Sequence, residues 1–304
     1  MTQIIFSQEA PKGWLPPAIA APFICIFLVA AGSLPFDFGF EYLGLVDAKG
    51  GPVGPLALCL FLLSFIGFGL LVLGWVRWVE KRSLVSVGLG GEGRLRKFLV
   101  GLAMGIAMIG AIVAAITLSG GYRVGDLAPA FASPVALGWI ALLLASFALQ
   151  SSVEEFVFRG WLFSVVMRRW NMSAAFILTS AAFTFLHFSP RQPLLMTAMT
   201  FAFSIFACAW IRRSNSLWGV MGWHTGWNWF AGTGFDVPIT GFDTHVPALV
   251  VKLLPAGSAY LNGGGEGPEG SIYTLALLTA ASMGLLLYAK PRERNGTDPP
   301  SSGH

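Results

Sequence analysis

Eight long apolar segments divide this sequence, and a helix of about 20 such residues is what crosses the hydrocarbon core of a bilayer. They span residues 17–34, 54–78, 98–119, 136–167, 172–189, 193–211, 216–232 and 271–289. Charged residues make up only 11% of the chain, against about 25% in soluble domains. The segments are continuous, unlike the alternating strands of about ten residues in a membrane β-barrel. The sequence therefore predicts an all-α, polytopic membrane protein of about eight transmembrane helices.

Lys and Arg residues are distributed unevenly between the loops that these spans define. With the N-terminus inside, fourteen of the nineteen lie on the inner side, four lie outside, and Arg159 lies within a span. The positive-inside rule expects this bias, which accounts for the net charge of +4 without a nucleic-acid partner. We expect an integral protein of a bacterial inner membrane with both termini in the cytoplasm. Cleavage of the first span as a signal peptide is an open alternative that leaves this orientation unchanged.

The segments group into four parts. Residues 1–135 hold the first three spans, and residues 136–232 hold four spans that carry polar side chains. Residues 233–270 form a long external loop, which is interpreted as a connector in preference to a lid. Residues 271–304 hold the last helix and a cytoplasmic tail that is expected to be disordered.

Two features of the spans carry expectations about packing. The fourth span would be about 48 Å long as one straight helix, so it is expected to tilt, kink or project from the bilayer. In the third span, Gly101 and Gly105 form a GxxxG pair, which is typical of close helix–helix packing in membranes.

Polar side chains inside a membrane are costly, so function is sought where they gather. Six lie deep inside three of the spans: Glu154, Glu155 and Arg159 in the fourth, His187 in the fifth, and His224 and Asn228 in the seventh. At a rise of 1.5 Å per residue, four of them lie roughly 12–23 Å from the inner ends of their helices: Glu154, His187, His224 and Asn228. We expect them to converge on one buried polar cavity. Any one of them alone would also suit a structural hydrogen bond between helices.

The two neighbouring glutamates of the fourth span are predicted to differ in role. Glu155 and Arg159 are four residues apart with the acid first, which is the favoured order for an ion pair on one helix face. Glu154 points about 100° away around the helix, so it need not share that arginine. Glu155 is therefore expected to be structural, and Glu154 is expected to be free to react.

These residue types suit the addition of water to a carbonyl group. A carboxylate in apolar surroundings is a useful general base, a histidine orients the water, and an asparagine amide with a histidine N–H stabilises an oxyanion. No cofactor is required by this chemistry. Zinc held by Glu154, His187 and His224 is the main alternative, since two histidines and a glutamate form a known catalytic set. A haem between the two histidines is a further one. Neither HExxH nor GxSxG occurs.

Three short motifs occur in order on three apolar segments: Glu154-Glu155-x-x-x-Arg159-Gly160, Phe183-x-x-x-His187 and His224-x-x-x-Asn228. Together they resemble the CPBP family of intramembrane proteases, also called the Abi or type II CAAX prenyl endopeptidase family. The resemblance covers residues 136–232. It implies a helical membrane core that holds a cavity in which a peptide bond is hydrolysed.

The resemblance also implies roles for the site residues. Glu154 activates the water with help from His187, His224 and Asn228 form the oxyanion side, and the Glu–Arg pair shapes the site. The family has been labelled both metalloprotease and glutamate-type protease, and the glutamate type is favoured here. The expected substrate is a peptide or membrane protein, with or without a lipid modification. A non-catalytic transporter or immunity protein on the same scaffold is the alternative from another functional class.

Overall fold

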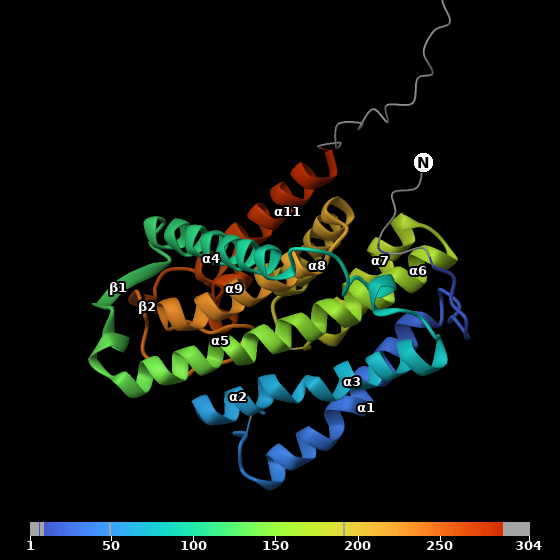
Figure 1. The fold of residues 1–304 in the computed structure, drawn as a ribbon. Helices are drawn as coiled ribbons and strands as arrows, with labels where there is room; N and C mark the ends of the chain where they lie inside the picture. Colours follow the sequence, from blue (N-terminus) through green and yellow to red (C-terminus); the bar gives the residue numbers. More distant parts are fainter. Residues whose placement is uncertain (1–5, 7–8, 49, 191, 288–304) are drawn as a thin grey trace, which may run out of the picture.

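A computed structural model describes residues 6, 9–48, 50–190 and 192–287. The chain forms a bundle of helices (Figure 1). The helices are α1 (Ala21–Tyr42), α2 (Pro55–Ser64), α3 (Ile66–Gly74), α4 (Arg94–Leu118), α5 (Pro134–Glu155), α6 (Phe163–Arg169), α7 (Met172–Leu186), α8 (Leu194–Ser214), α9 (Trp218–Phe235), α10 (Ala259–Asn262) and α11 (Ile272–Leu287). Two strands, β1 (Tyr122–Leu127) and β2 (Val251–Pro255), pair antiparallel with Tyr122 opposite Pro255. Apart from this small sheet and short turns, the predicted all-α fold is confirmed.

Each of the eight predicted segments is mainly helical over its described residues, but the count of membrane spans is not confirmed. By length and composition, five described helical stretches could cross a membrane: Ala21–Tyr42, Pro55–Val79, Arg94–Leu118, Pro134–Arg169 and Leu194–Ser214. Helices α7 and α11 are apolar but shorter. The first helix was expected to end at residue 34, and it continues past Pro35 to Tyr42, since a proline is tolerated in membrane helices. The predicted disordered tail lies outside the described residues.

Helix α9 lies at the centre of the bundle, between α4 and α5 in Figure 1, and it packs against both. Nearly all of its residues are buried. A helix surrounded by protein need not be apolar, because neighbouring side chains and not lipid meet its polar groups. This position explains how α9 can carry the polar residues His224, Thr225 and Asn228. Helix α9 is accordingly not one of the five long apolar stretches.

The close approach of α4 and α9 depends on glycines. Gly101 and Gly105 on α4 face α9, and Gly222 and Gly226 on α9 face α4. A Cβ atom on Gly101 would lie only 1.9 Å from the carbonyl oxygen of Gly219. Small residues let two helix backbones approach closely in this way, and the predicted packing role of the GxxxG pair is confirmed. Helix α4 therefore holds the polar central helix in place.

Replacing Gly101 by Ala is expected to lower the free energy of unfolding by about 1–3 kcal/mol, the usual cost of overpacking. The matched control is Gly110→Ala on the same helix, because a Cβ there would meet its nearest described neighbour at an ordinary 3.8 Å. Unfolding of the purified protein in detergent, followed by circular dichroism, measures both. Equal stability of the two variants would contradict the packing role.

Local sequence sets where two of the site helices begin. Helix α5 starts with Pro134 at its first position, and the hydroxyl of Ser133 accepts a hydrogen bond from the Ala136 amide at 3.3 Å. Helix α7 is capped by Asn171, which accepts from the Ala174 amide at 2.9 Å. Both are standard ways to satisfy the free N–H groups of a first helical turn.

The fourth span continues from Pro134 to Arg169 and is not regular throughout. A π-helical segment, Phe156–Leu162, separates α5 from α6 and begins directly after the two glutamates. Such wide turns are frequently found at functional positions in helices. The irregularity lies at the place where the sequence concentrates charge.

The external loop between α9 and α11 is folded, which corrects its interpretation as a plain connector. It contributes β2, and it forms short helical turns at Gly264–Glu266 and Pro268–Gly270. Its Glu269 is buried and accepts a hydrogen bond from Trp227 of α9. Buried polar side chains need such partners, so this contact anchors the loop to the helices.

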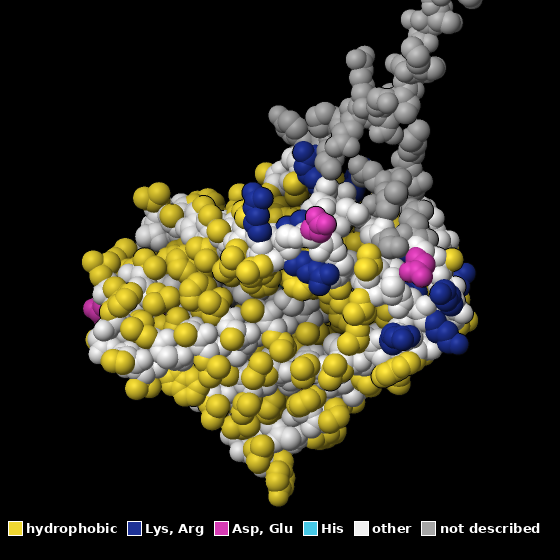
Figure 2. All heavy atoms as spheres, viewed as in Figure 1, with side chains coloured by type: hydrophobic (Ala, Val, Ile, Leu, Met, Phe, Trp, Pro, Cys, Tyr) yellow, Lys and Arg dark blue, Asp and Glu magenta, His cyan; other side chains and the backbone are white. Residues whose placement is uncertain are grey.

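The surface is divided into apolar sides and a basic end. Figure 2 shows large hydrophobic areas over the helices, with Lys and Arg gathered toward the end near the last turns of α3 and α8. A soluble monomer rarely exposes so much apolar surface, which is consistent with an integral membrane protein. Five of the counted basic residues lie outside the described part of the chain: Lys49, Arg191, Lys290, Arg292 and Arg294.

Candidate functional site

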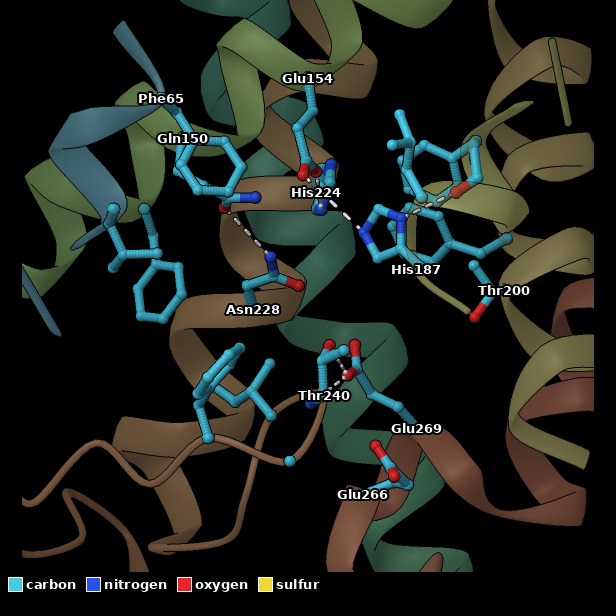
Figure 3. Close-up of a pocket in the computed structure, with 18 of the residues that line it drawn as sticks. Phe65, Gln150, Glu154, His187, Thr200, His224, Asn228, Thr240, Glu266 and Glu269 are labelled. Atoms are coloured by element: carbon cyan, nitrogen blue, oxygen red, sulfur yellow. Dashed lines mark hydrogen bonds and ion pairs between the residues drawn. The ribbon is translucent and has the colours of Figure 1, made fainter. Parts of the chain in front are cut away.

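One cavity of about 610 Å³ lies beside α9 and brings four of the predicted site residues together (Figure 3). Glu154 comes from α5, His187 from the end of α7, and His224 and Asn228 from α9. The expected convergence of these side chains is therefore observed. Glu155 and Arg159 are not among the lining residues and lie buried beside the cavity.

The carboxylate of Glu154 faces two imidazole rings. It is 5% exposed; its Oε1 lies 3.8 Å from Nε2 of His187, and its Oε2 lies 3.6 Å from Nε2 of His224. Both distances exceed that of a hydrogen bond. Oε2 is buried without a hydrogen-bond partner among the described residues. Such an oxygen is costly unless a donor reaches it, and a water molecule or a substrate would supply that donor.

The predicted ion pair is present and also holds one of the histidines. Nη1 of Arg159 donates to Oε1 of Glu155 at 3.2 Å, and the same oxygen lies 2.9 Å from Nδ1 of His224. The guanidinium lies over the ring of Phe183, 4.1 Å from its centroid. A carboxylate only accepts, so Nδ1 of His224 carries the hydrogen. The pair therefore directs Nε2 of His224 toward Glu154.

His187 is oriented by the end of its own helix. Its Nδ1 lies 2.9 Å from the carbonyl oxygen of Phe183, and its ring stacks on the Phe183 ring at 4.2 Å. Since a carbonyl only accepts, Nδ1 carries the hydrogen and Nε2 faces Glu154. Both histidines thus present the same nitrogen to one carboxylate, although they are held by unrelated groups.

The amide of Asn228 is held by a residue that the sequence interpretation missed. Nδ2 of Asn228 donates to Oε1 of Gln150 at 3.3 Å, and Oγ of Ser151 donates to the same oxygen at 3.1 Å. Gln150 lies one helical turn before Glu154 and lines the cavity. A buried amide four residues before the candidate base, in an apolar span, was the signal that could have identified it.

The far side of the cavity is lined by the external loop. Oε1 of Glu269 accepts from Nε1 of Trp227 at 2.8 Å, and Oε2 accepts from the amide and hydroxyl of Thr240 at 2.9 and 2.8 Å. Figure 3 shows Thr240, Glu266 and Glu269 together, below the histidines. Burial, and next the nearby Glu269, raise the pKa of Glu266. No local pattern links this loop to α9, so sequence reasoning could not place it here.

A zinc ion would have to use Glu154, His187 and His224. Within the described residues, no three or more His, Cys, Asp or Glu side chains are gathered as a metal-binding group. In the present arrangement both Nε2 atoms are turned toward the carboxylate oxygens. The geometry is that of one carboxylate flanked by two imidazole rings, each at a distance longer than a hydrogen bond.

Comparison with known families identifies the segment that carries the site. Residues 135–230 match the family model described as type II CAAX prenyl endopeptidase Rce1-like. The matched range nearly coincides with residues 136–232, and the predicted resemblance is confirmed over it. No curated protein matches the chain.

Proposed function

Because residues 135–230 match the Rce1-like type II CAAX prenyl endopeptidases, we propose that this protein is a membrane-embedded endopeptidase whose water is activated by Glu154. The observation that carries the proposal is the buried carboxylate of Glu154, which two imidazole Nε2 atoms face within 4 Å. We place the protein in a bacterial inner membrane with its Lys- and Arg-rich end in the cytoplasm. The substrate is a peptide or membrane protein.

The proposed reaction uses Glu154 first as a base and then as an acid. Its carboxylate takes a proton from a water that His187 orients, and the water oxygen attacks the carbonyl carbon of the substrate. The tetrahedral intermediate collapses as Glu154 returns the proton to the leaving nitrogen.

The oxyanion of the intermediate is assigned to His224 and Asn228. One hydrogen of the Asn228 amide is engaged by Gln150, and an amide nitrogen carries two, so the other can serve the oxyanion. Nδ1 of His224 is held by Glu155, and an imidazole that carries a hydrogen on both nitrogens would donate to the oxyanion through Nε2.

A comparison of new protein termini in membranes tests the function without a guess at the substrate. Cells producing the wild-type chain are compared with cells producing Glu154→Gln at the same level. Termini that occur only with the wild-type chain are expected, and they identify the substrate and the bond. Identical termini would contradict proteolysis and favour a transporter or an immunity protein.

Replacing Asn228 by Ala is expected to lower kcat by about 10²–10³, the usual effect of one oxyanion donor, with little change in KM. The reason is that this hydrogen bond strengthens only in the transition state. Kinetics on the substrate identified above measure both constants. A raised KM with unchanged kcat would instead assign Asn228 to substrate binding, and proton-coupled transport would not require the amide at all.

Removal of divalent metals separates the two protease types. We expect full activity after exhaustive treatment with chelators, because the proposed base is a carboxylate and the proposed oxyanion donors are side chains. The measurement is the cleavage rate before treatment, after it, and after addition of Zn²⁺. Loss of activity that Zn²⁺ restores would show zinc dependence and would favour the alternative in which Glu154, His187 and His224 act as ligands.

A further inference from the structure

A second cavity, of about 620 Å³, lies at the basic end of the molecule, where the π-helical segment Trp75–Val79 follows α3. Four basic residues line it: Lys12, Arg77, Lys81 and Arg82. None of its lining residues lines the cavity that holds Glu154. Figure 2 shows Lys and Arg side chains at this end, next to an apolar surface.

The positive charge of this cavity is largely unbalanced. Arg82 is buried and paired with Glu80 at 2.9 Å, so it forms the inner wall. Lys12, Arg77 and Lys81 are exposed, and none of them takes part in the described ion pairs. No carboxylate lines the cavity among the residues that the structure describes. Lys81 also has a left-handed backbone with φ of 51°, a conformation that costs energy for a residue other than glycine.

The segment that carries Lys12 is fixed beside the cavity. The amide of Gly13 donates to the carbonyl of Glu80 at 2.9 Å, and that of Trp14 donates to the carbonyl of Val79 at 3.0 Å. A Cβ atom on Gly13 would lie 2.1 Å from the Val79 oxygen, so only glycine permits this approach. The three exposed cations are therefore brought together by the fold.

The remaining wall of the cavity is mainly apolar. Leu73, Trp78 and Leu84 line it, and Trp78 is 75% exposed. Leu70, three residues before Leu73 on α3, also has an exposed apolar side chain. The hydroxyl of Ser83, also in the lining, is buried without a described hydrogen-bond partner. An anionic group would pair with the basic wall, and a hydrocarbon chain attached to it would pack against the apolar wall.

We propose that this cavity binds the phosphate headgroup of an anionic phospholipid, with an acyl chain along Trp78 and the apolar face of α3. Lys and Arg at a membrane surface attract anionic lipids, and a tryptophan at the interface has an apolar body and a polar N–H. A free phosphate ion would use the cations but would leave the apolar wall without a role. The proposal does not depend on the peptidase function.

Thermal unfolding of the full chain in detergent micelles, with added phosphatidylglycerol or phosphatidylcholine, tests the proposal. A ligand that binds the folded state raises Tm, and phosphatidylglycerol is expected to raise it more than phosphatidylcholine does. The double variant Arg77→Gln/Lys81→Gln is expected to need about thirtyfold more phosphatidylglycerol for the same rise, the effect of two surface charges. The matched control is Arg96→Gln/Lys97→Gln, which removes two exposed charges from the start of α4.

The outcomes separate a lipid site from two alternatives. A selective loss in the first double variant, with equal Tm of all proteins before lipid is added, supports the proposal. The same loss in the control variant would show that only the overall charge matters and would overturn it. An equal rise in Tm with inorganic phosphate at the same concentration would also overturn it, since the apolar wall would then contribute nothing.

Discussion

Replacing Glu154 by Gln is expected to reduce the rate of peptide hydrolysis by at least about a hundredfold, because general acid–base catalysis contributes about 10²–10⁴. The amide has nearly the same shape as the carboxylate, but it cannot take a proton from water. The folded protein is expected to be as stable as the wild type or more so, since the buried Oε2 atom has no described partner to lose. Single-turnover cleavage and thermal unfolding measure the two effects.

The control for this change is Glu92→Gln, which replaces an exposed glutamate in the loop before α4. It makes the same chemical substitution away from the cavity and is expected to leave the rate and the stability unchanged. If Glu154→Gln kept the wild-type rate in a protein that folds normally, Glu154 would not be the base. The same retained rate would leave the two histidines as the candidates for activating the water.

Replacing Glu155 by Gln is expected to lower the free energy of unfolding by about 3–5 kcal/mol, the usual cost of removing one partner of a buried ion pair. Arg159 is fully buried, and its Nε and Nη2 atoms have no hydrogen-bond partner in the described part of the chain. Its charge would then lack compensation. Activity is expected to fall as well, because Glu155 holds Nδ1 of His224. Chemical unfolding in micelles measures the stability.

The neighbouring substitution Glu154→Gln is the matched comparison for Glu155→Gln. Both remove a buried carboxylate from the end of α5, but only Glu155 is bonded to a guanidinium. The double variant Glu155→Gln/Arg159→Met is expected to recover most of the lost stability, because it removes the uncompensated charge as well. Equal stability of the two single variants would contradict the structural role of the ion pair.

Much of the fold could be predicted because it depends on local properties of the chain. A run of apolar residues specifies a helix in lipid regardless of its neighbours, and all eight predicted segments are helical. The pairing of Glu155 with Arg159 follows from the 3.6-residue period alone. The order of the three motifs was enough to identify the segment that matches the Rce1-like family.

Helix α9 shows where this local reasoning stops. Whether a helix meets lipid or protein depends on which helices surround it, and glycines far apart in sequence, such as Gly101 and Gly222, allow α4 to reach it. The external loop shows the same limit, because the hydrogen bond that Trp227 donates to Glu269 joins residues 42 positions apart. Gln150 was visible as a polar residue, but its contact with Asn228 depends on how α5 crosses α9.

The sequence by itself determined the class of protein, the helical segments and the residue types able to perform hydrolysis, since hydrophobicity and helical periodicity act within one segment. Only the tertiary structure decided that Nε2 of His187 and of His224 both face Glu154, while Glu155 holds Nδ1 of His224. Those contacts join three helices, and their geometry depends on side-chain packing between segments. The basic cavity beside α3 has the same origin, because it needs Lys12 and Lys81 to be brought together by the fold.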